Sequence, residues 1–143
     1  MQKSKKQKTP DSSSYLALYG SLMAPFTTQE ALGLSGQLTL LGKCQLAAKL
    51  YDLGDYPGLT LSKHKSDIVH AELYSFSNQA VLTILDEFED YQPDDDQTSL
   101  YKRILINLLE PQIEAWVYVY NQAVLESNFI PSGSWETYLA GRK

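Results

Sequence analysis

The sequence YKRILINLLEPQIEAWVYVYN, residues 101–121, decides the fold class. It contains two stretches rich in β-branched and aromatic residues, 101–109 and 113–121, joined by Glu110-Pro111-Gln112 as in a β-hairpin. Every residue from Ala115 to Tyr120 is apolar or aromatic, so both faces of the second strand are suited to burial. Such a strand favours a closed or covered sheet over an open one.

The stretches before this hairpin predict more strands and one main helix. Residues 15–19 form an apolar run that stops at a turn, which indicates a buried strand. Residues 37–51 place apolar side chains mainly at alternate positions, with a bend or bulge at Gly42, and residues 69–74 alternate with a period of two. Residues 78–88 carry apolar side chains at helical spacing behind an N-capping asparagine, which predicts the main helix.

Four shorter segments are expected to connect these elements. The spacing of Thr and Glu in residues 27–30 predicts a short helical turn that continues to Leu32. Residues 52–58, dense in Gly, Asp and Pro, have the composition of a turn. Residues 93–96 read as a solvated acidic loop, and residues 130–135 as a turn before a short helical or extended end.

Composition bounds the domain organisation. The chain has 143 residues, of which 43% are hydrophobic and 20% charged, as expected for one domain with a single core. Residues 1–14 hold four lysines against one aspartate and predict a disordered basic tail, and residues 15–143 are assigned to the folded domain. Because the net charge is −5 and the basic cluster lies in the tail, nucleic acid is not an expected partner.

The cysteine content and hydropathy exclude other classes. Cys44 is the single cysteine, so no internal disulfide is possible, and no Cys or His cluster is present that would predict a metal site. No apolar run approaches the ~20 residues that a membrane span requires, and no signal peptide is evident. We therefore expect a cytoplasmic protein without metal or other cofactor and without a membrane partner; the sequence leaves its oligomeric state open.

The usual nucleophilic sets are not evident in the sequence. His64 lies between two lysines, and His70 occupies an outward position of its strand, so both are interpreted as structural. Ser21 follows Gly20 at a strand exit, as in a nucleophile elbow, but no second glycine follows and no histidine is placed to activate it. A Ser-His-Asp enzyme is therefore not expected.

Carboxylates near the end of the predicted helix are the stronger candidates for chemistry. Asp86, Glu87, Glu89 and Asp90 lie together there, and a solvated acidic helix end is the alternative interpretation. Asp86 and Glu89 share a helix face with Leu85, so these two are expected to point inward and Glu87 to face solvent. A partly buried carboxylate with a raised pKa can transfer protons near neutral pH.

In their order and approximate spacing, the motifs from Tyr15 to Trp135 together resemble the gamma-glutamylcyclotransferase-like family. The matching segments are residues 19–22 (YGSL), 55–59 (DYPGL), 69–74 (VHAELY), 85–89 (LDEFE) with Tyr91, 101–103 (YKR), 115–120 (AWVYVY) and 130–135 (IPSGSW). The resemblance implies an α+β fold, a small mixed β-barrel flanked by one main helix and short helical segments, with a cavity at one end.

The resemblance also implies a reaction, the cyclisation of a gamma-glutamyl amine or gamma-glutamyl amino acid to 5-oxoproline with release of the amine. It assigns the general acid/base to Glu89 and binding of the glutamyl group to the turn of Tyr19, Gly20, Ser21 and Leu22. Tyr19 and Tyr120 are expected as walls of the binding pocket, with an aromatic that packs inside the barrel as the alternative for each. The substrate supplies both its nucleophile and its electrophile, so one carboxylate and a few backbone N–H donors are sufficient.

Two positions depart from the family pattern, and two other functions remain as alternatives. The family often has Gly after the catalytic Glu and Thr in its turn, where this chain has Asp90 and Ser21. Asp90 places a second negative charge beside Glu89, which raises the pKa of Glu89 or accompanies a change of substrate. The alternatives are a non-catalytic domain that binds a small metabolite on the same fold, and a hydrolase that uses Ser21. Arg103 is expected to anchor structure or pair with an acidic residue.

Overall fold

The computed structural model describes residues 14–20, 22–23, 28–92 and 97–141. The basic tail, Ser21, Thr27 and the acidic loop at 93–96 therefore lie outside the described residues, except for Ser14. The elements are β1 (Tyr15–Leu18), α1 (Thr28–Ala31), β2 (Thr39–Asp52), β3 (Pro57–Leu61), β4 (Ile68–Ser75), α2 (Ala80–Phe88), β5 (Tyr101–Asn107), β6 (Glu114–Tyr120), η3 (Glu126–Asn128) and α3 (Trp135–Gly141).

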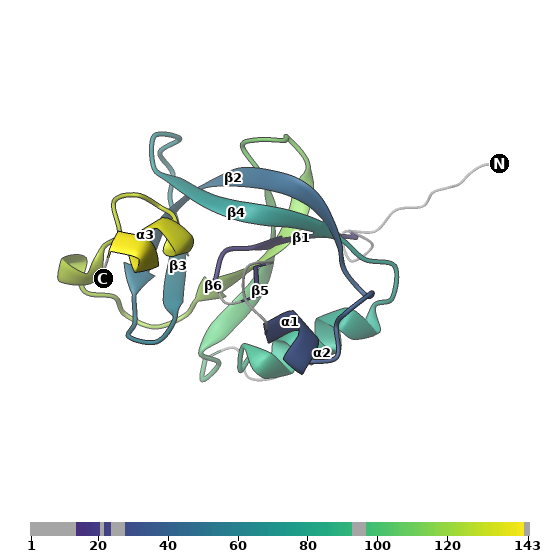
Figure 1. Cartoon of the computed structure of the whole chain (residues 1–143). Coiled ribbons are helices and arrows are strands. Elements are labelled where there is room, and N and C mark those ends of the chain that lie inside the picture. Colours follow the sequence, from purple (N-terminus) through teal and green to yellow (C-terminus); the bar gives the residue numbers. More distant parts are fainter. Residues whose placement is uncertain (1–13, 21, 24–27, 93–96, 142–143) are drawn as a thin grey trace.

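The strands form one six-stranded mixed sheet in the order β3-β2-β4-β1-β6-β5. β1 and β6 pair in parallel, and the other neighbours are antiparallel. Figure 1 shows β2 and β4 as two long curved strands that run together, with α3 near β3 at one end and α1 and α2 at the other. The sheet curls into a half-barrel, which confirms the expected α+β class and the small mixed barrel.

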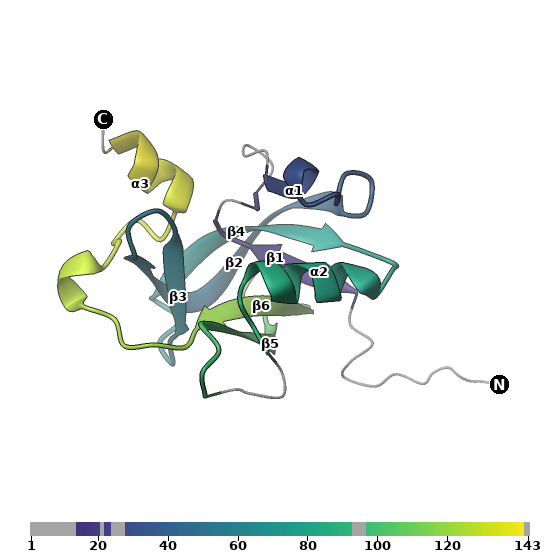
Figure 2. The ribbon, with the colours of Figure 1, turned by 90° about the horizontal axis from the view of Figure 1, so that it is seen from below.

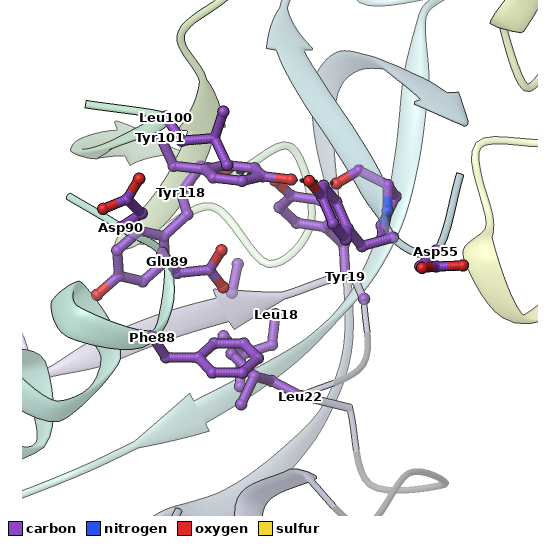
Figure 3. Close-up of a pocket in the computed structure, with 14 residues that line it drawn as sticks. Leu18, Tyr19, Leu22, Asp55, Phe88, Glu89, Asp90, Leu100, Tyr101 and Tyr118 are labelled. Carbon is purple, nitrogen blue, oxygen red and sulfur yellow. Dashed lines mark hydrogen bonds between the residues drawn. The ribbon is translucent and has the colours of Figure 1, made fainter. Parts of the chain in front are cut away.

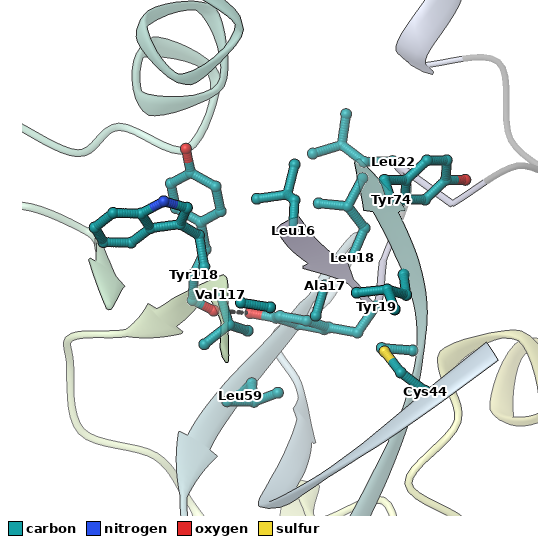
Figure 4. Close-up of a cluster of buried hydrophobic side chains, with 14 of the residues drawn as sticks. Leu16, Ala17, Leu18, Tyr19, Leu22, Cys44, Leu59, Tyr74, Val117 and Tyr118 are labelled. Atoms are coloured by element: carbon teal, nitrogen blue, oxygen red, sulfur yellow. Dashed lines mark hydrogen bonds between the residues drawn. The ribbon is translucent and has the colours of Figure 1, made fainter. Parts of the chain in front are cut away.

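β1 is central in the sheet and buried. Leu16, Ala17 and Leu18 are at most 3% exposed, which explains why this strand reads as a continuous apolar run. They belong to a large buried cluster in which side chains from β1, β2, β3, β4 and β6 meet (Figure 4). The predicted hairpin, the predicted strand at 69–74 and the bulge at Gly42 are all present in the sheet.

The two ends of the sheet approach each other near β3. The Tyr101 hydroxyl on β5 donates a 2.7 Å hydrogen bond to the Pro57 carbonyl on β3. A Cβ atom added at Gly58 would lie 3.1 Å from the Tyr120 side chain, so the backbone of β3 passes very close to β6. The prediction of a turn over residues 52–58 was wrong at its ends, since β2 continues to Asp52 and β3 begins at Pro57.

The main helix, α2, lies beside β1 and β6 (Figure 2), and the Tyr118 hydroxyl of β6 donates a hydrogen bond to its Asp86. The prediction of a helix over 78–88 is confirmed within two residues, since α2 runs from Ala80 to Phe88. The N-cap is Gln79 rather than the predicted Asn78, whose side-chain oxygen accepts a 2.9 Å hydrogen bond from the Ala80 N–H just before the helix. Val81, Leu82 and Leu85 are buried as predicted, whereas Phe88 is 42% exposed. No helix in the described part of the chain is long and apolar enough to cross a bilayer.

Candidate active site

A cavity of about 310 Å³ opens between the exit of β1, the β2–β3 loop and the end of α2. Figure 3 shows the side chains that surround it. Its described lining residues are Ala17, Leu18, Tyr19, Gly20, Leu22, Asp55, Tyr56, Pro57, Phe88, Glu89, Asp90, Leu100, Tyr101 and Tyr118. The structure thus brings the predicted turn and the predicted carboxylate together around one hollow, although they are far apart in the sequence.

Glu89 is the carboxylate inside this cavity. Its side chain points toward the rings of Tyr101 and Tyr19, while the carboxylate of Asp90 points away (Figure 3). No ion pair or hydrogen bond to the Glu89 carboxylate occurs among the described residues. Burial raises its pKa from an ordinary 4.5 to about 8. Burial, rather than the adjacent charge of Asp90, is therefore the cause of the shift that the sequence suggested.

The end of α2 fixes the direction of this side chain. Glu89 is the C-cap residue, and Asp90 has the left-handed φ of 57°. The Tyr91 N–H bonds to the Asp86 carbonyl at 2.8 Å and the Asp90 N–H to the Glu87 carbonyl at 3.2 Å, the paired bonds of a Schellman motif. This left-handed position favours glycine, the residue that the family often has here. Asp90 therefore adopts the conformation at a local energetic cost.

Asp90→Gly is expected to stabilise the fold by about 1 kcal/mol, because glycine adopts a left-handed φ without a Cβ penalty and removes a negative charge from a helix C-terminus. Urea denaturation measures the change. Asp90→Asn is the matched control, since it removes the charge and keeps the Cβ, and should recover a smaller part of the gain. A less stable glycine variant would contradict this explanation of the motif.

Asp86, the other inward carboxylate, is occupied by an ion pair. Arg103 on β5 binds it with two donors, Nε at 2.8 Å and an Nη at 3.1 Å, and the Tyr118 hydroxyl donates to it at 2.7 Å. Burial alone would lower the pKa of Arg103, but the hydrogen bond and charge of Asp86 raise it. The guanidinium also lies 4.5 Å from the centre of the Trp116 ring. This network fastens α2 to the hairpin and confirms the expected pairing of Arg103.

Tyrosines form the walls around Glu89. The Tyr19 hydroxyl donates a 2.5 Å hydrogen bond to the Tyr118 carbonyl, so its ring is held across β1 and β6. Burial and the charge of Glu89 raise the pKa of both Tyr19 and Tyr101, and burial with the Asp86 hydrogen bond raises that of Tyr118. All three remain neutral phenols near pH 7 and give the carboxylate a largely apolar surrounding.

The turn after β1 lies across the cavity from Glu89. The Met23 N–H donates to the Gly20 carbonyl at 3.0 Å and closes the turn. A Cβ atom at Gly20 would lie 3.1 Å from the Pro57 ring, so glycine allows the turn to pack against β3. Gly20 and Leu22 line the cavity as predicted. Ser21 lies outside the described residues.

Sequence reasoning missed several of the lining residues and placed Tyr120 too near the cavity. Tyr120 pairs with Tyr101 across the hairpin, and its ring packs edge-on against that of Tyr101 at 5.4 Å. Tyr101 lines the cavity, whereas Tyr120 is absent from its described lining. The register places both rings on one face of the hairpin. The β-hairpin register was the signal that could have identified Tyr101, while Phe88 was interpreted only as a core residue of the helix.

No group of three or more His, Cys, Asp or Glu side chains in the described ranges is placed to hold a metal ion. No histidine lines the cavity among the residues that the structure describes, and His70 is exposed on β4. Cys44 is buried, and burial raises the pKa of its thiol to about 12. The chemical groups that the cavity offers are thus a carboxylate, backbone amides and phenols.

The protein is thus a small α+β half-barrel with a carboxylate in its cavity. The chain belongs to the AIG2-like gamma-glutamyl cyclotransferase family, whose model matches residues 16–137. A curated relative from Halalkalibacterium halodurans, named "Putative gamma-glutamylcyclotransferase", is 36% identical over 103 residues, which cover 71% of this chain and 89% of that protein. A relative of the same name from Vibrio cholerae is 37% identical over 86 residues, covering 60% of this chain and 64% of that protein.

Solved structures show the same fold. An AIG2-like protein from Mus musculus superposes with a TM-score of 0.64 at 21% identity, covering 85% of this chain and 86% of that chain. The solution structure of the protein ytfP from Escherichia coli gives a TM-score of 0.60 at 29% identity, covering 85% and 95% of the two chains. Both are similar to this chain over most of their length.

Proposed function

We propose that the protein is a gamma-glutamyl cyclotransferase that converts a gamma-glutamyl amine or amino acid to 5-oxoproline and releases the amine. The observation that carries the proposal is the Glu89 carboxylate, which faces the Gly20–Leu22 turn across one cavity and has no described ionic or hydrogen-bonding partner. A binding domain for a neutral or anionic metabolite has no use for such a carboxylate. A proton-transfer enzyme needs one whose pKa lies near the working pH, and that of Glu89 is about 8.

The proposed reaction begins with the α-ammonium group of the substrate. Glu89 in its ionised form takes one proton, and the freed α-nitrogen attacks the γ-carbonyl carbon to close a five-membered ring. Backbone N–H groups of the Gly20–Leu22 turn donate to the resulting oxyanion. Glu89 then delivers its proton to the departing nitrogen as the γ-amide bond breaks. The carboxylate, ionised again, takes the second proton from the ring nitrogen and releases it to solvent, which leaves a neutral lactam. The products are 5-oxoproline and the free amine, and no water is consumed.

The test is to incubate purified protein with a panel of gamma-glutamyl compounds and to measure 5-oxoproline and the released amine by mass spectrometry. Equal amounts of the two products support the proposal. Release of free glutamate in place of 5-oxoproline would indicate hydrolysis instead. Saturable binding of the same compounds without either product would indicate the non-catalytic metabolite-binding domain.

The charge around the cavity predicts which compounds in the panel react best. Asp55, Glu89 and Asp90 line it, and no Lys, Arg or His does so in the part of the chain that the structure describes. A leaving group with a free carboxylate is repelled there, whereas a neutral or cationic amine is not. We expect kcat/KM for gamma-glutamyl amines to exceed that for gamma-glutamyl amino acids by at least about tenfold.

The exposed mouth residue Asp55 provides the variant that checks this preference. Asp55→Lys should narrow the difference between the two substrate groups, mainly by improving the amino acid derivatives. Glu126→Lys is the matched control, because it makes the same change in net charge on η3, away from the described lining of the cavity. An equal effect of both variants, or no preference in the parent protein, would contradict the electrostatic argument.

A further inference from the structure

A chain of three polar side chains connects a buried carboxylate to the turn beside Glu89. Glu72 on β4 is 5% exposed, and the Tyr74 hydroxyl donates to its Oε1 at 2.7 Å. Gln29 on α1 donates from Nε2 to the Tyr74 oxygen at 3.0 Å, and the same nitrogen donates to the Leu22 carbonyl. None of these three polar side chains belongs to the described lining of the cavity, and the proposed reaction does not use them.

The hydrogen-bonding chemistry of these side chains fixes which group donates and which accepts at each contact. A carboxylate only accepts hydrogen bonds, so Glu72 requires the proton of the Tyr74 hydroxyl. With that proton given to Glu72, the Tyr74 oxygen can only accept from Gln29, so Gln29 presents its NH₂ rather than its carbonyl oxygen. The second proton of that NH₂ is directed at the Leu22 carbonyl. By accepting the Tyr74 proton, the Glu72 side chain thereby decides, two side chains away, which group of Gln29 faces the turn.

The series of hydrogen bonds ends at a peptide group of the proposed substrate-binding turn, which it holds in place. Leu22 lines the cavity, and the following residue, Met23, donates its N–H to the Gly20 carbonyl. With Gln29 on the Leu22 carbonyl and Gly20 on the Met23 N–H, both polar groups of the Leu22–Met23 peptide are held. A rotation of this peptide would turn its carbonyl dipole and alter the field in which an oxyanion forms.

The Tyr74 ring is part of the rigid core. It is 2% exposed and belongs to the buried cluster, from which its hydroxyl points outward (Figure 4). Tyr74 pairs across the sheet with Leu16 of β1 and Leu40 of β2, so strands on both sides fix its position. The short helix α1, which has no buried residues of its own, is thus tied to the core through Gln29.

From these contacts we propose that Glu72, Tyr74 and Gln29 are positioning residues that set the orientation of the Gly20–Met23 turn for catalysis. The inference rests on the proposed function for its effect on turnover, and on the hydrogen bonds alone for its effect on the turn. The proposal predicts that a hydrogen-bond donor at position 29 works and an acceptor does not. If Gln29 served only to pack α1 against the core, this difference would not be expected.

Three substitutions at one position test the proposal. Gln29→Lys keeps a donor group that can reach both oxygens, Gln29→Met keeps the length without polarity, and Gln29→Glu presents only acceptors. We expect kcat/KM for 5-oxoproline formation to stay within about threefold of the parent for Lys, to fall about tenfold for Met and to fall further for Glu. Glu30→Gln is the control, since Glu30 is its exposed neighbour on α1.

A structural measurement separates this inference from the proposed reaction. Amide resonances of Gly20, Leu22 and Met23 in ¹⁵N-labelled protein should shift in the Met and Glu variants and stay near their parent positions in the Lys and Glu30 variants. If the parent makes no 5-oxoproline, the reaction is wrong and these resonances still decide the positioning. Unshifted resonances in all variants, or shifted resonances with unchanged turnover in an active parent, would overturn the inference.

Discussion

Glu89→Gln is expected to lower kcat for 5-oxoproline formation by roughly 10²- to 10⁴-fold while the substrate continues to bind. Glutamine has almost the same shape as glutamate but can neither take the ammonium proton nor return it to the departing nitrogen. Steady-state kinetics of product formation, with calorimetric titration of 5-oxoproline to show that the pocket is intact, measures the effect. Full activity in this variant would eliminate the proposed mechanism.

The pH dependence of the parent provides a second measure of the same group. The base form of Glu89 carries out the first proton transfer, so kcat/KM should rise with pH and level off above about pH 8. The Gln variant should lack this rise in its residual activity. An activity profile in the parent that is flat between pH 6 and pH 9 is the result that this assignment does not allow.

The same substitution is expected to stabilise the fold at alkaline pH. Because the pKa of Glu89 is raised in the folded state, its contribution to stability is fully present below its unfolded value of 4.5 and is lost as the pH rises through about 8. Glutamine does not titrate, so the difference in free energy of unfolding should grow over this range, with an upper limit of ~5 kcal/mol. Parallel stability curves would show that Glu89 ionises freely.

Gly133→Ala is expected to destabilise the protein by about 3 kcal/mol or more, the largest effect of an alanine substitution among the described glycines. Gly133 has a φ of 66°, and a Cβ atom there would lie 2.0 Å from the Ile68 carbonyl oxygen of β4. The Gly133 carbonyl also accepts a 2.8 Å hydrogen bond from the His70 N–H. The loop before α3 cannot move away without losing that bond to the sheet.

Two other glycines separate the contributions in that prediction. Gly36 has a φ of 80° but open space around its Cβ direction, and Gly141 in α3 has neither a left-handed φ nor a close neighbour. We therefore expect alanine to cost most at Gly133, about 1 kcal/mol at Gly36 and nothing or a slight gain at Gly141. Chemical denaturation of the three variants gives the order, and an equal cost at Gly133 and Gly36 would contradict the steric argument.

The regular elements could be predicted because the spacing of their apolar side chains follows directly from which face of each strand or helix is buried. The hairpin at 101–121 and the helix ending at Phe88 have side chains whose spacing matches the face they bury. β3 was missed because Pro57 and Gly58 are residues of turns by composition, yet at the edge of the sheet proline loses no ladder bond. Glycine there admits the Tyr120 ring. Such contacts depend on segments distant in sequence.

The site was predictable to a similar extent. Glu89 and the turn after β1 could be selected because the motif order identified a family and the helix face indicated direction. Gln29 could not, since its role depends on a tertiary contact of its amide with Tyr74. The hairpin register could have indicated Tyr101, but not the contact of its hydroxyl with Pro57. The left-handed conformation of Asp90 was not predicted either, because the departure from the family's Gly was interpreted as a change of charge rather than of backbone conformation.

The way in which β3 joins the far side of the half-barrel has a consequence for the evolution of the family. The contact between β5 and β3 is made by one side chain, that of Tyr101 on Pro57, whereas β2 and β4 are joined by a ladder of backbone hydrogen bonds. The loop at 53–56 can therefore gain or exchange residues without shifting the register of the strands. That loop forms the mouth where the leaving amine would emerge, while Glu89 lies at the end of α2 and the substrate-binding turn follows β1. Insertions there can diversify the accepted amines and leave the cyclising half of the pocket unaltered.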